Sequence, residues 1–117
     1  MITIYVYQKC STCRDALRWL DERKIPYQAK AIRETPPSVA ELKQALAFLG
    51  GDLKKLFNTS GLDYRAMGLK EKLPTLSENE ALALLSANGN LVKRPFVLGE
   101  DFALVGFKEP AWQACFS

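Results

Sequence analysis

The feature that most constrains the fold is a pair of cysteines between an apolar segment and a helix-like segment. Residues 2–7 form an almost continuous apolar run, which predicts a strand buried on both faces. Cys10 and Cys13 follow at Cys-x-x-Cys spacing. Apolar positions then recur at helical spacing, at Cys13, Ala16, Leu17 and Leu20. The pattern predicts a dithiol at the carboxyl end of a strand, where open α/β sheets place their chemistry.

The rest of the chain predicts an α/β fold with its helices concentrated in the middle. The expected strands are residues 2–7, 27–32, 91–98 and 102–105, with a turn at 99–101 between the last two. Ser38 with Glu41 and Ser77 with Glu80 form capping boxes that each predict the start of a helix. Gly50-Gly51 predicts the end of the first of these helices. A parallel pair at the front and a hairpin at the back predict one mixed sheet of about four strands.

Length, charge and hydropathy narrow the classes of function. A chain of 117 residues is expected to form a single domain, residues 1–117, with an ordinary core. No apolar run approaches the roughly 18 residues needed to cross a bilayer, and no signal-peptide pattern occurs, so we expect a cytoplasmic protein without membrane contact. The net charge of +3 is scattered rather than clustered, so we expect no direct binding of nucleic acid. We also expect the chain to be a monomer.

Three cysteines and no histidine argue against a metal centre and favour thiol chemistry. Cys10 is expected at a helix N-terminus, where unpaired N–H groups, the helix dipole and the neighbouring Lys9 and Arg14 favour a thiolate. Cys13, one turn later on the apolar face, is placed to resolve a mixed disulfide and should be the more buried thiol. Two packed, unreactive cysteines are the alternative. Cys115 is expected to act as a small hydrophobic residue.

Several motifs occur together along the chain. They are Cys10-Ser11-Thr12-Cys13-Arg14 after the apolar strand, Pro36-Pro37-Ser38 with Glu41-Leu42, Tyr64 with Gly68-Leu69, Lys93-Arg94-Pro95 and Leu104-Val105-Gly106-Phe107. In this order they resemble the ArsC-like family, which comprises arsenate reductase and its Spx, MgsR and YffB relatives. The resemblance covers the whole chain. It implies a thioredoxin-like fold, in which a mixed four-stranded sheet is flanked by helices and a helical insertion separates the βαβ and ββα halves.

The resemblance also implies an arrangement of the site. Pro95 would be cis and lie beside Cys10, and Arg94 would point its guanidinium at the thiolate or at a bound oxyanion. The expected catalytic residues are therefore Cys10, Cys13 and Arg94. The residues expected to contact the substrate are Ser11, Thr12, Arg14 and Pro95. No metal or organic cofactor is expected, although glutathione or a thioredoxin-type protein must supply electrons.

The match to arsenate reductase itself is incomplete. Two of the three arginines that hold arsenate in that enzyme are replaced here by Asn58 and Gly106. Each replacement would remove a charge-assisted contact worth about 1.5–3 kcal/mol. The resemblance therefore implies a thiol–disulfide oxidoreductase that reduces a small substrate or a disulfide, ahead of true arsenate reduction.

The second cysteine keeps a regulatory function open. Cys13 completes the Cys-x-x-Cys pair that serves as a redox switch in the Spx and MgsR branch. Those regulators act through the C-terminal domain of the RNA polymerase α subunit, which is thus a possible partner. Gly50-Gly51 lies near the position where Spx uses a glycine at that interface, although an ordinary helix end would also explain the pair.

Overall fold

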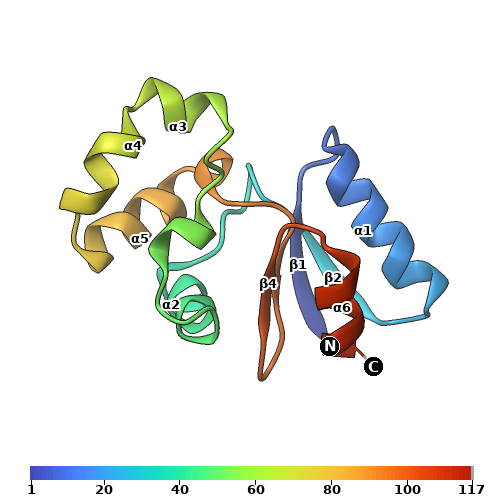
Figure 1. Cartoon of the computed structure of the whole chain (residues 1–117). Coiled ribbons are helices and arrows are strands. Elements are labelled where there is room, and N and C mark those ends of the chain that lie inside the picture. The colour runs from blue at the N-terminus through green and yellow to red at the C-terminus, as the bar shows by residue number, and fades with distance from the viewer. Residues whose placement is uncertain (117) are drawn as a thin grey trace.

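The chain folds into a four-stranded mixed sheet with helices on both sides (Figure 1). The structure is a computed structural model and describes residues 1–116. Strands β1 (Ile2–Val6), β2 (Tyr27–Ala31), β3 (Phe96–Leu98) and β4 (Ala103–Val105) lie in the order β2-β1-β3-β4. β1 and β2 are parallel, whereas β3 is antiparallel to both β1 and β4. The predicted sheet of a parallel pair and a hairpin is confirmed.

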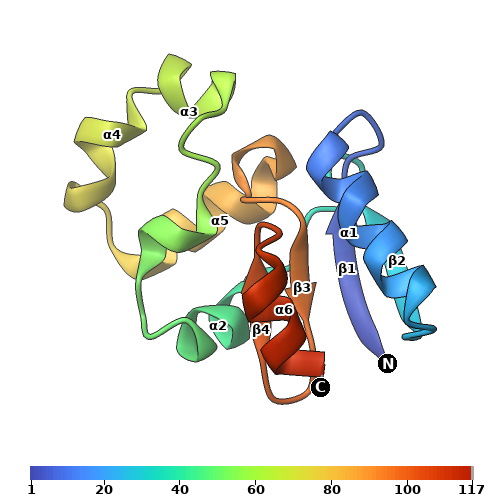
Figure 2. The ribbon, with the colours of Figure 1, turned by 45° about the vertical axis from the view of Figure 1, so that its right-hand side comes forward.

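The helices fall into two groups. The sheet is accompanied by α1 (Ser11–Glu22) and α6 (Glu109–Phe116), whereas α2 (Val39–Phe48), α3 (Leu62–Ala66), α4 (Leu69–Lys72) and α5 (Glu78–Ala87) form a helical insertion between β2 and β3. Figure 2 shows this insertion as a separate lobe beside the sheet. The arrangement is the thioredoxin-like fold with a helical insertion that the resemblance implied. Within residues 1–116, no helix is both long enough and apolar enough to cross a membrane.

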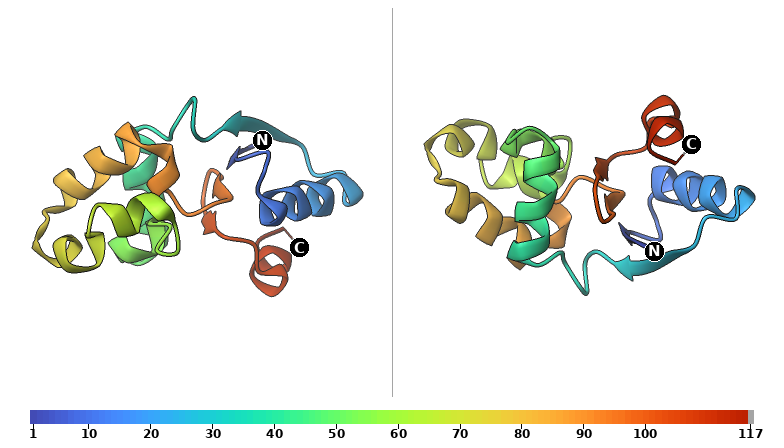
Figure 3. Two further views of the ribbon diagram at one scale, coloured as in Figure 1. Left: turned by 90° about the horizontal axis from the view of Figure 1, so that it is seen from above. Right: turned by 90° about the horizontal axis from the view of Figure 1, so that it is seen from below.

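The strands divide their side chains between two cores because successive residues of a strand point to opposite faces. On one face, Ile4 and Val97 pack with residues of α1 and with the fully buried Trp112 of α6. On the other face, Tyr5 and Phe96 pack with the helical insertion. Seen from above and below, the insertion and the α1–α6 pair lie on different sides of the sheet (Figure 3). The sheet is therefore a buried middle layer whose edge carries the dithiol.

The predicted helix boundaries in the insertion are confirmed by their hydrogen bonds. The Ser38 hydroxyl accepts from the N–H of Glu41 (3.1 Å), and the Glu41 carboxylate accepts from the N–H of Ser38 (3.0 Å). Ser77 and Glu80 make the same pair of bonds at the start of α5. Gly50-Gly51 ends α2 with φ values of 76° and 80°, a left-handed conformation that favours glycine.

One predicted strand is wrong in its length. Residues 91–98 were expected to be continuous, but only Phe96–Leu98 pairs within the sheet. Val92 instead forms an isolated antiparallel bridge with Phe57, and the N–H of Lys93 donates to the carbonyl of Leu56 (2.8 Å). The backbone of this segment thus bonds to the insertion before the chain enters the sheet. The peptide bond between Arg94 and Pro95 is cis, as the resemblance implied.

Candidate thiol site

The topology brings three chain segments to one edge of the sheet. Because β1 and β2 are parallel, their carboxyl ends lie at the same edge, and Cys10 and Arg33 follow those ends. β3 is antiparallel to β1, so Arg94 and Pro95, which precede β3, arrive at this edge as well. Residues far apart in the sequence are thereby gathered around the start of α1.

Cys10 is a half-buried thiol at the N-cap of α1. Its backbone N–H donates to the carbonyl of Tyr7 (3.0 Å), which fixes the loop that carries the sulfur. Burial of the sulfur raises the pKa of Cys10. This effect is outweighed by hydrogen bonds from the N–H and thiol of Cys13, by the charge of Arg94 and by a hydrogen bond from the N–H of Thr12. Together they hold the pKa of Cys10 below its ordinary value. These surroundings favour the nucleophilic thiolate.

Cys13 is a buried thiol with the opposite behaviour. Its side chain is 1% exposed, and this burial is the main reason why its pKa is raised to about 12. A hydrogen bond and the negative charge of Cys10 raise the pKa further, whereas the N–H of Tyr7 and the charge of Arg94 lower it. Cys13 is the more buried thiol, as expected. The pKa of Cys10 is thus lowered and that of Cys13 raised, which favours ionisation of Cys10 before Cys13.

The other sequence-predicted residues lie around the dithiol in different settings. Ser11 and Thr12 are exposed on the first turn of α1, and the backbone N–H of Thr12 bonds to the Cys10 sulfur. Arg14 is also exposed, and its Nη1 donates to the carbonyl of Gln8 (3.1 Å). This hydrogen bond stabilises the loop between β1 and α1. Pro95 is buried next to Arg94. Their contact with a substrate remains a prediction.

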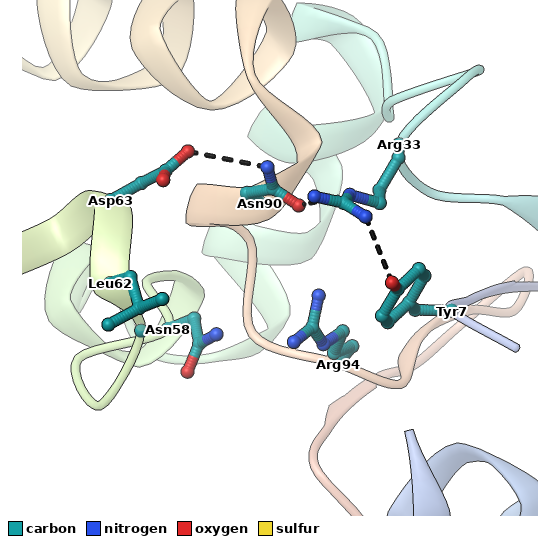
Figure 4. A pocket seen from close by; sticks show the side chains of 8 residues that line it. Tyr7, Arg33, Asn58, Leu62, Asp63, Asn90 and Arg94 are labelled. Carbon is teal, nitrogen blue, oxygen red and sulfur yellow. Dashed lines mark hydrogen bonds between the residues drawn. The ribbon is translucent and has the colours of Figure 1, made fainter. Parts of the chain in front are cut away.

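Arg94 and a second arginine, Arg33, both contact the ring of Tyr7 (Figure 4). The guanidinium carbons of Arg94 and Arg33 lie 5.0 Å and 4.7 Å from the ring centroid. Arg33 also donates from Nη1 to the Tyr7 hydroxyl (2.9 Å) and from Nε to Oδ1 of Asn90 (2.7 Å). No sequence motif marks Arg33, although its position directly after the second predicted strand is a signal that it lies at this edge of the sheet.

A pocket of about 150 Å³ opens beside these two arginines. Its remaining wall includes Asn58, Leu62, Asp63 and Asn90, which come from the helical insertion. Asn58, which the resemblance places where an arsenate-binding arginine is expected, lines this pocket, whereas Gly106, the other such position, is not among the lining residues.

Asp63 is the acidic residue of the pocket. Its Oδ2 accepts from the side-chain amides of Asn88 (3.0 Å) and Asn90 (3.3 Å). These hydrogen bonds, and to a smaller degree the charge of Arg33, hold the pKa of Asp63 below its ordinary value. The pocket therefore contains two cations and one carboxylate. Nowhere in residues 1–116 do three His, Cys, Asp or Glu side chains form a group that could hold a metal ion.

Comparison with known proteins assigns the chain to a family. Residues 5–115 match the ArsC family. The chain belongs to the ArsC family. Among its ArsC-family relatives, the uncharacterized protein YusI of Bacillus subtilis is 47% identical over 112 residues, covering 96% of this chain and 95% of YusI.

Two further ArsC-family relatives carry different names. The global transcriptional regulator Spx of Listeria innocua is 28% identical over 109 residues, covering 93% of this chain and 82% of Spx. A crystal structure described as a possible arsenate reductase from Streptococcus mutans superposes with a TM-score of 0.91 at 43% identity, covering 99% and 98% of the two chains. Membership of the family is thus compatible with both an enzyme and a regulator.

Proposed function

We propose that the chain is a thiol–disulfide oxidoreductase in which Cys10 is the nucleophile and Cys13 the resolving thiol. The observation that carries this proposal is that the two sulfurs differ in burial and have pKa values shifted in opposite directions. Cys10 is half-buried at a helix N-terminus with a lowered pKa, whereas Cys13 is buried with a pKa raised to about 12. An attacking thiol must be ionised and accessible, and a resolving thiol must stay protonated until the first step has occurred.

The first step is attack by the Cys10 thiolate on one sulfur of a small disulfide substrate. A mixed disulfide forms on Cys10, and half of the substrate leaves as a thiol. The hydrogen bond and the negative charge of Cys10, which raise the pKa of Cys13, are then lost. The N–H of Tyr7 and the charge of Arg94 remain and favour the Cys13 thiolate. The first step therefore lowers the pKa of the thiol that performs the second, while burial continues to raise it.

In the second step, Cys13 attacks the Cys10 sulfur and releases the other half of the substrate as a thiol. The substrate gains two electrons and two protons, and the protein is left with a disulfide between Cys10 and Cys13. An external thiol, either glutathione or a thioredoxin-type protein, returns the disulfide to the dithiol by further exchange. This cycle suits the cytoplasm, where such reductants keep thiols reduced.

A redox-sensing regulator is the second candidate function. The match to Spx over 93% of this chain favours it. The same dithiol would then act as a switch, and the partner would be the C-terminal domain of the RNA polymerase α subunit. The left-handed conformation of Gly50-Gly51 accounts for that glycine pair as a helix end without a partner. Arsenate reduction ranks below both functions because Asn58 and Gly106 stand where that chemistry uses arginines.

The two leading functions can be separated by turnover and trapping. Cys115 is exposed on α6 rather than packed as expected, so it should be replaced by serine in every protein tested. With bis(2-hydroxyethyl) disulfide and glutathione, we expect turnover in this background, its loss in Cys10→Ser, and a mixed disulfide that accumulates in Cys13→Ser. Turnover that survives Cys10→Ser would refute the enzyme. Absence of turnover, together with oxidation-dependent binding to the isolated α-subunit domain, would favour the regulator.

A further inference from the structure

Arg33 supplies a second cation to the pocket beside Tyr7, and neither the sequence motifs nor the proposed thiol exchange accounts for it. We propose that the pocket between Arg33 and Arg94 binds the carboxylate of a small disulfide or thiol substrate, and that Arg33 determines this specificity. The inference rests on the proposed thiol–disulfide exchange and deepens it, because it names the chemical class of the substrate.

The pocket and the dithiol share two residues. The backbone of Tyr7 bonds to both cysteines, since its carbonyl accepts from the N–H of Cys10 and its N–H stabilises the sulfur of Cys13. The Tyr7 ring meanwhile contacts both guanidiniums, and the charge of Arg94 acts on both sulfurs. A substrate with a short arm between its sulfur and its anionic group can therefore meet Cys10 and the arginines together.

The charges of the pocket favour a monoanion. Two guanidiniums and the carboxylate of Asp63 give the lining a net charge of +1. Among residues 1–116, the one side-chain ion pair joins Arg18 to Asp15, so neither Arg33 nor Arg94 is neutralised by a bound carboxylate. A carboxylate matches this charge, and its two oxygens match the planar fork of an arginine. A dianion such as an inorganic oxyanion would leave one charge uncompensated beside Asp63.

The position of Arg33 is fixed although its side chain is exposed. Asp63 accepts from Asn90, Asn90 accepts from Arg33 Nε, and Arg33 donates to the Tyr7 hydroxyl (Figure 4). This chain of hydrogen bonds runs from the helical insertion to the residue after β1. A cation that is already oriented loses less side-chain freedom when it binds an anion.

The size and lining of the pocket suit a short carbon chain. Its volume of about 150 Å³ equals that of about five water molecules. Leu62, whose side chain is 80% exposed, and the Tyr7 ring supply apolar surface beside the charged groups. A carboxylate on two or three methylene groups fits these dimensions.

The test compares three small disulfides that differ in charge. They are the anionic 3,3′-dithiodipropionate, the neutral bis(2-hydroxyethyl) disulfide and the cationic cystamine. The rate of mixed-disulfide formation on Cys10 is measured by acid quench and mass spectrometry in the Cys115→Ser background. Each rate is divided by the rate of the same disulfide with a neutral small thiol. In these relative rates, we expect the anionic disulfide to react about tenfold faster than the neutral one. This ratio corresponds to the lower limit of the free energy of one charge-assisted hydrogen bond.

The variants assign that preference to Arg33. Arg33→Gln should lose the tenfold preference for the anionic over the neutral disulfide, and Arg33→Lys should retain part of it. Arg65→Gln removes the same charge from an exposed position on α3 and should change nothing. Equal reactivity of the three disulfides, or equal slowing of all three by Arg33→Gln, would overturn the inference.

The failure of this inference differs from the failure of the proposed function. If Cys10 is not a nucleophile, the proposed function fails and Cys10 reacts with none of the three disulfides. A sulfur-free probe still tests the pocket in that case. Butanoate should shift the NMR signal of the Arg33 Nε–H and, in the wild type but not in Arg33→Gln, that of the Tyr7 amide. Unmoved signals at millimolar butanoate would count against the pocket as a carboxylate site.

Discussion

Glu41 connects the central sheet to the helical insertion, and its replacement should destabilise the fold measurably. Its Oε1 accepts from the hydroxyl of Tyr5 on β1 (2.7 Å) and from the N–H of Ser38 at the start of α2 (3.0 Å). Tyr5 is 1% exposed, and its hydroxyl has Glu41 as its hydrogen-bond partner in the folded protein. In Glu41→Ala, the incomplete cap costs about 1 kcal/mol, and the stranded hydroxyl costs about 1–3 kcal/mol. The free energy of unfolding should therefore fall by about 2–4 kcal/mol.

Glu41→Gln separates the charge from the hydrogen bonds. Glutamine retains an acceptor for Tyr5 and can complete a capping box, so only the charge assistance is lost. We expect a loss of about 1 kcal/mol, the difference between charged and neutral hydrogen bonds. Urea unfolding followed by tryptophan fluorescence measures both variants, and Glu100→Ala, at an exposed turn, is the matched control. A change below about 0.5 kcal/mol in Glu41→Ala would refute the reasoning.

The same contact makes a prediction about pH. Burial raises the pKa of Glu41, but hydrogen bonds from Ser38 and Tyr5 and the charge of Lys30 hold it below its ordinary value. A lowered folded-state pKa adds stability above the unfolded value of about 4.3, and this stability is lost as the pH falls through the folded pKa. The difference between wild type and Glu41→Gln should thus be complete at pH 7 and shrink below about pH 4. A difference that stays constant with pH would contradict this assignment.

Three further changes have defined outcomes. Trp112→Phe should cost about 1–3 kcal/mol in urea unfolding, because the carbonyl of Gly106 loses the buried indole donor at 3.1 Å. Gly68→Ala should cost about 1–2 kcal/mol in the same assay, since its φ of 62° is left-handed. Arg94→Gln should raise the pKa of Cys10 by removing a charge that lowers it, as measured by thiolate absorbance; an unchanged thiolate titration would exclude that role for Arg94.

Local patterns were sufficient to predict most of the fold. The capping boxes at Ser38 and Ser77 depend on residues three positions apart, so the sequence contains the whole motif. The exposed and buried sides of α1 follow from its own periodicity, and Cys13 lies on the buried side as expected. The prediction of a continuous strand over residues 91–98 is wrong because a local apolar pattern does not show which distant segment the backbone pairs with. Val92 bonds to Phe57 in the insertion, which no local pattern indicates.

The residues of the candidate site also divide into those that a local motif predicts and those that only the tertiary structure brings together. The dithiol is a local motif, and the role of Arg94 came from the family resemblance. Arg33 lies 61 positions before Arg94 in the sequence, and no motif links the two. Only the parallel pairing of β1 with β2 brings Arg33 to the edge that carries Cys10. The sequence contained the expected β-α-β unit, and extending that topology to the residues after the second strand would have identified Arg33.

The central claim is that Cys10 is an activated thiolate while Cys13 remains protonated. The direct measurement is the pH dependence of iodoacetamide alkylation of the reduced protein, with Cys115→Ser and with mass spectrometry to locate the label. We predict that Cys10 is labelled first, with a titration midpoint below the ordinary cysteine value of about 8.5. Cys13 should remain unlabelled until far higher pH, in keeping with its pKa of about 12. A Cys10 midpoint at or above 8.5, or labelling of Cys13 before Cys10, would contradict the account.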